Sequence, residues 1–66
     1  MKPLTGIELC KLLEQNGWEL RRVAGSHHIF KKTGRRETLS VPVHSSTTLK
    51  AGTQRTLLRL AGIETQ

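Results

Sequence analysis

Two adjacent histidines and four cations fall within one short segment, HHIFKKTGRR at residues 27–36. Histidine can exchange a proton near neutral pH, and lysine and arginine stabilise the charge of a phosphate. RNA cleavage needs little more, because the ribose 2′-hydroxyl is itself the nucleophile and a side chain has only to take its proton. The candidate bases are His27 and His28, and the candidate phosphate ligands are Lys31, Lys32, Arg35 and Arg36.

Other catalytic chemistries find less support in the sequence. There is a single cysteine, all the acidic residues are glutamates, and adjacent histidines on a strand would point to opposite faces. We therefore predict no metal site and no cofactor. Cys10 lies near the apolar stripe of a predicted helix, as a small buried thiol would. Ser26 precedes His27 directly and would not face it, so neither residue is a favoured nucleophile.

Size and charge restrict the type of protein. The 66 residues suffice for one small domain, residues 1–66. Eleven lysines and arginines against five acidic residues give a net charge of +6, which attracts polyanions such as RNA or DNA. The single cysteine fits a reducing compartment. The first ten residues contain no long apolar run, so we expect a cytoplasmic protein with no membrane association.

The elements that must position the histidines follow from periodicity and turn residues. Thr5 and Glu8 form a capping box that predicts a helix over 5–16. A second helix is expected at 52–61, with Thr53, Leu57, Leu58 and Ala61 on its buried side. Between them, three short strands are predicted around WELRRV, HHIFKK and ETLSVPV. The sequence thus predicts an α+β fold, α-β-β-β-α, with both helices on one face of an antiparallel sheet.

Strand alternation leaves the choice between the two histidines open. His27 shares a face with Ile29, and His28 shares a face with Phe30. Whichever apolar residue packs under the helices carries its histidine inward, and the other histidine faces the open surface. The same alternation puts Arg21 and Arg22 on opposite faces of the first strand, so at most one of them joins a given patch. We include Arg22 in the predicted RNA-binding set.

The order of four segments resembles the HicA family of bacterial toxins over almost the whole chain: NGW, then GSHHIF, VPVH and LKAGTQRTLLRLAGIE. The resemblance implies a fold like the double-stranded-RNA-binding domain. It also implies an mRNA interferase, a metal-independent endoribonuclease that cleaves single-stranded mRNA until an antitoxin, HicB, binds and masks it. Ala51 departs from the family pattern, in which proline is common.

The resemblance also implies where the catalytic histidine lies. In the family it belongs to the strand opened by the Gly-Ser-His motif, which here corresponds to His27. Some members carry it one place later, which would be His28. His44 after VPV has no role to carry over, and we interpret it as the end of the third strand.

Two alternatives remain. A non-catalytic RNA-binding module would grip phosphates with a basic cluster where the last helix begins, but only Lys50 and Arg55 stand there. A degenerate toxin would fold and bind its antitoxin without cutting. If the hairpin cations line the RNA path, replacing them should weaken RNA binding. The fold should survive, because exposed cations add little stability.

Overall fold

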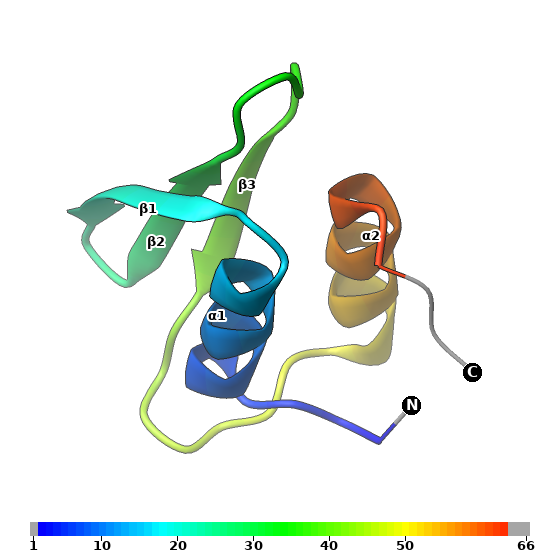
Figure 1. Cartoon of the computed structure of the whole chain (residues 1–66). Coiled ribbons are helices and arrows are strands. Elements are labelled where there is room, and N and C mark those ends of the chain that lie inside the picture. Colours follow the sequence, from blue (N-terminus) through cyan, green and yellow to red (C-terminus); the bar gives the residue numbers. More distant parts are fainter. Residues whose placement is uncertain (1, 64–66) are drawn as a thin grey trace.

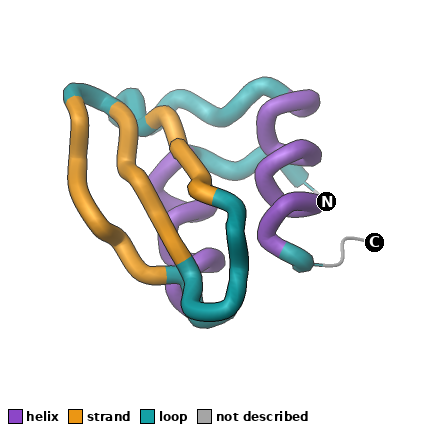
Figure 2. Tube along the Cα trace, turned by 90° about the horizontal axis from the view of Figure 1, so that it is seen from above, coloured by secondary structure: helices purple, strands orange, loops and turns teal. Residues whose placement is uncertain are grey.

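The computed structural model describes residues 2–63, so the predicted domain of residues 1–66 extends at both ends outside the described residues. The elements follow in the order α1 (Gly6–Gln15), β1 (Glu19–Ala24), β2 (His27–Lys31), β3 (Thr38–Pro42) and α2 (Ala51–Ala61). Both helices lie on the same side of the sheet (Figures 1 and 2). The predicted α-β-β-β-α fold is confirmed, and it is consistent with the architecture of a double-stranded-RNA-binding domain.

Helix α1 begins as its sequence indicates. The Thr5 hydroxyl accepts the Glu8 amide at 3.1 Å, and the Glu8 carboxylate accepts the Thr5 amide at 2.9 Å. This reciprocal capping box satisfies two amides that a helix start leaves unpaired. At the other end Gly17 adopts a φ of +90°, which favours glycine, and the chain turns into the sheet.

The three strands form an antiparallel sheet in the order β1-β2-β3. In the β2–β3 ladder His28 lies opposite Val41, and Phe30 lies opposite Leu39. Phe30, Leu39 and Val41 are buried, so this set of positions faces the helices. The alternate positions of β2 and β3 therefore form the open face of the sheet, which no described helix covers.

Helix α2 completes the core through Leu57, Leu58 and Ala61, as predicted. The fourth predicted residue is wrong in detail: Thr53 is only half-buried, and its neighbour Gln54 is buried. Gln54 is accommodated because its side-chain oxygen accepts the Leu4 amide at 2.7 Å and its nitrogen donates to the Lys2 carbonyl at 3.0 Å. Helical periodicity cannot predict hydrogen bonds to backbone groups that are so distant in the sequence.

Candidate functional site

His27 lies at the first position of β2, on the open face of the sheet. Its side chain is exposed, and its Nδ1 atom lies 3.2 Å from the hydroxyl oxygen of Ser40 on the neighbouring strand. This hydrogen bond engages Nδ1 of the imidazole ring. The second ring nitrogen, Nε2, is the other atom that can take or give a proton. Ser40 was not among the predicted residues, although the alternation of Thr38-Leu39-Ser40 does place it on the open face.

His28 lies on the other face of the same strand. It shares that face with Phe30, which is only 1% exposed in the core, and it pairs with Val23 and Val41 in the two ladders. His28 itself is half-buried. The two histidines are therefore separated by the sheet, and His27 is the one that a molecule on the open face would meet.

A bulge in β1 changes the predicted positions of the two arginines. The register with β2 shifts between Leu20 and Arg22, so Arg21 is an extra residue and Arg22 lies opposite Ile29 on the open face. Arg21 forms a 3.4 Å ion pair with Glu19, which lies opposite Lys31 on that same face. The expectation that only one of these arginines could join a given patch is wrong, because it assumed regular alternation.

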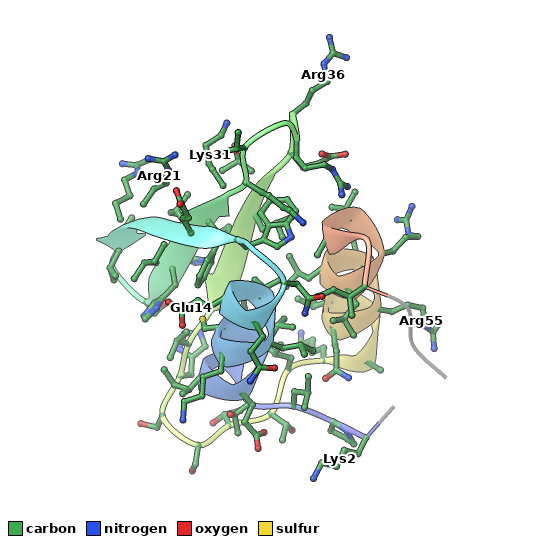
Figure 3. All side chains as sticks on the ribbon, viewed as in Figure 1. Lys2, Glu14, Arg21, Lys31, Arg36 and Arg55 are labelled. Atoms are coloured by element: carbon green, nitrogen blue, oxygen red, sulfur yellow. The ribbon has the colours of Figure 1, made fainter. Side chains whose placement is uncertain are left out.

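Lys31 extends the open face towards the far end of β2. It lies opposite Thr38 in the ladder, and its ammonium group donates a hydrogen bond to the Thr38 hydroxyl at 3.2 Å. Figure 3 shows Arg21 and Lys31 pointing away from both helices. Together with Arg22, they give the open face its positive charge.

Two of the hairpin cations have structural partners instead. The Lys32 ammonium donates to the Asn16 carbonyl at 2.8 Å, at the end of α1. The Arg35 guanidinium donates to the Leu60 carbonyl at 2.6 Å, in the last turn of α2. A cation at a helix C-terminus satisfies a free carbonyl and interacts favourably with the helix dipole.

Arg35 makes two further contacts. Its Nε lies 3.2 Å from the Glu37 carboxylate, and its guanidinium carbon lies 5.7 Å from the centre of the Trp18 ring. Lys32 and Arg35 are therefore half-buried and not fully exposed as expected, and each donates to a helix carbonyl. Arg36 is exposed and points away from the molecule at the hairpin tip (Figure 3).

Cys10 is buried among apolar side chains of the core. Burial raises the pKa of its thiol to about 11, and the neighbouring carboxylate of Glu14 acts in the same direction. The thiol is therefore protonated at neutral pH, which does not suit a nucleophile.

Two kinds of binding feature are absent from residues 2–63. No three side chains among the histidines, cysteine and acidic residues described there come together as ligands for one metal ion. In the same part of the chain, no helix is long and apolar enough to cross a membrane.

A small α-β-β-β-α domain with a three-stranded antiparallel sheet belongs to the class of α+β domains whose architecture is consistent with the double-stranded-RNA-binding-domain fold. The comparison with known families is more specific. The family described as the HicA toxin of bacterial toxin-antitoxin systems matches residues 6–63. The chain therefore belongs to the HicA toxin family, which implies an antitoxin as its partner. A search of curated proteins found no significant match.

Proposed function

We propose that this HicA-family toxin is a metal-independent endoribonuclease that cleaves single-stranded mRNA with His27 as its general base. The observation that carries the proposal is the position of His27. It lies exposed on the open face, and its Nδ1 atom is 3.2 Å from the hydroxyl oxygen of Ser40. A base must reach the proton it abstracts, and of the two adjacent histidines His27 is the more exposed one.

The proposed reaction begins when Nε2 of His27 takes the proton of a ribose 2′-hydroxyl. For this step the Nδ1–H group donates to Ser40, so that the Nε2 lone pair is free. The 2′-oxygen then attacks the adjacent phosphorus, the bond to the 5′-oxygen breaks, and a 2′,3′-cyclic phosphate forms. Ser40 acts here as a positioning residue, because it orients the ring and does not touch the substrate.

Arg22 and Lys31 are the cations best placed to stabilise the charged phosphate. Arg22 lies opposite Ile29, the next open-face position of β2 after His27, and Lys31 is the open-face position after that. Cationic donors near the developing charge lower the barrier more than they strengthen substrate binding. Arg36 can contact RNA at the hairpin tip. Lys32 and Arg35 have backbone partners in the helices, and we assign them to RNA binding only through their general positive charge.

A HicB-type antitoxin completes the proposed function as the partner that neutralises the nuclease. The alternative, a non-catalytic RNA-binding module, would depend on the basic residues at the start of α2. Lys50 and Arg55 are the residues available there. The open-face histidine has no function in that alternative.

The experiment is a cleavage assay on a single-stranded RNA with the purified protein in excess EDTA. We expect cleavage that persists under chelation and yields 2′,3′-cyclic phosphate ends. His27→Ala protein prepared in parallel controls for contaminating ribonucleases. Activity that disappears with EDTA and returns with Mg²⁺ or Mn²⁺ would contradict the metal-independent mechanism, and RNA binding without cleavage would support the non-catalytic module.

A further inference from the structure

A pocket of about 320 Å³ opens at the end of β3. Its polar lining comes from His44, Thr47, Thr48, Lys50 and Thr53, and Pro42 forms part of its wall. The pocket thus combines a titratable imidazole, a cation and several hydroxyl groups. These groups suit a nucleotide, which offers a phosphate and ribose oxygens to such donors.

The strand register places this pocket beside His27. Pro42 is the direct ladder partner of His27. Pairing continues one residue further, because the Val43 amide donates to the Ser26 carbonyl at 2.7 Å. Val43 packs against the core, and His44 lines the pocket together with Pro42, two residues before it.

Pro42 connects the two histidines, because it is the ladder partner of His27 and lines the same pocket as His44. His44 is exposed, like His27.

The segment that carries His44 is held at several points. The Thr47 amide donates to the His44 carbonyl at 2.9 Å, and the Leu49 amide donates to the Leu4 carbonyl at 2.8 Å. Figure 1 shows this loop passing the N-terminal end of α1 on its way to α2. Ser45 adopts a φ of +51°, an uncommon conformation for a residue other than glycine. The backbone after His44 is thus constrained, and a constrained backbone suits a residue that must be positioned.

We propose that His44 is the second proton-transfer residue of the nuclease and that the pocket holds the leaving nucleotide. This inference rests on the proposed function of His27. As the 2′-oxygen bonds to phosphorus and loses its proton to His27, the P–O5′ bond breaks and His44 in its cationic form gives a proton to the departing 5′-oxygen. One proton is taken and one is given, so the charges balance and no co-reactant is needed.

The test compares two RNA substrates that differ only at the leaving atom, one with the ordinary 5′-oxygen and one with sulfur in its place. A thiolate leaves without protonation, so the sulfur substrate does not need an acid. We expect His44→Ala to lower cleavage of the oxygen substrate by about 10²-fold or more and to cleave the sulfur substrate at nearly the wild-type rate. His27→Ala should be impaired on both substrates.

The pH profile gives a second readout. A reaction that needs both a base and an acid gives a bell-shaped pH–rate profile, and we expect His44→Ala to lack the falling limb of the wild-type profile. Lys50 is the charged residue that lines the pocket together with His44. His44→Gln provides a polar variant of similar size, and thermal melting confirms that each variant is folded.

The outcomes separate the two proposals. If the wild-type protein cleaves RNA and His44→Ala cleaves both substrates at the wild-type rate, or loses equal activity on both, the role of His44 is overturned while that of His27 stands. If wild-type protein cleaves neither substrate, the proposed nuclease itself is overturned, and the role of His44 with it.

Discussion

The two ends of the β2–β3 hairpin carry similar basic residues but differ in what those residues contact. At the start of β2, His27 is exposed and lies within hydrogen-bond distance of the Ser40 hydroxyl on the adjacent strand. At the other end, Lys32 and Arg35 reach out of the hairpin to the last carbonyls of α1 and α2. The first end leaves a titratable group accessible for chemistry, whereas the second end uses its charges to hold the helices against the sheet.

Trp18 explains why the second end is built in this way. Its indole nitrogen donates to the Ala61 carbonyl at 3.3 Å, next to the carbonyl that accepts from Arg35. Arg35 also lies over the face of the same indole ring. One aromatic side chain and one arginine thus close the C-terminus of α2, and a small core gains from such contacts because its burial alone stabilises it only marginally.

The largest expected difference between the two ends of the hairpin is in their effect on catalysis. His27→Ala should lower RNA cleavage by about 10²- to 10⁴-fold, because the base is lost, with little change in thermal stability. His28→Ala is the matched control and should retain a measurable rate, since His28 lies on the helix side of β2. Equal rates for both variants and for the wild-type protein would remove histidine as the base.

Much of the histidine end follows from the sequence, because alternation is a local rule. The alternation predicted that one histidine shares a face with Ile29 and the other with Phe30. The structure shows Phe30 buried in the core, so His28 lies on the helix side and His27 on the open face. The bulge at Arg21 was not predictable, since no glycine or proline marks it. Local patterns also could not predict that Lys32 and Arg35 have backbone partners while Arg36 is exposed. The partners of Lys32 and Arg35, Asn16 and Leu60, lie far away in the sequence.

A smaller effect is expected on stability at the hairpin end. Arg35→Ala removes a charged hydrogen bond to a backbone carbonyl and a contact with Trp18, so we expect it to lower the free energy of unfolding by about 1–3 kcal/mol. Urea unfolding followed by Trp18 fluorescence measures this change. Arg36→Ala removes the same charge at the exposed tip and should leave the urea midpoint unchanged. Equal midpoints for the two variants would mean that Arg35 does not hold α2.

The smallest effect concerns the salt dependence of RNA binding, measured with a 2′-deoxy-substituted strand that cannot be cleaved. Removing one cation that neutralises a phosphate should reduce the slope of log affinity against log salt by about 0.7 for a single strand. We expect this reduction for Arg22→Gln and for Lys31→Gln, because both side chains belong to the open face.

Arg55→Gln is the matched control for this measurement. It removes one positive charge from the exposed side of α2, where Figure 3 shows Arg55 pointing away from the sheet. If RNA crosses the open face near His27, this substitution should leave the slope unchanged, because the side chain of Arg55 points away from the sheet. A slope that falls for Arg55→Gln but not for Arg22→Gln would move the RNA to α2. The residues around His27 would then have no substrate to act on, and the non-catalytic module would become the better account of this chain.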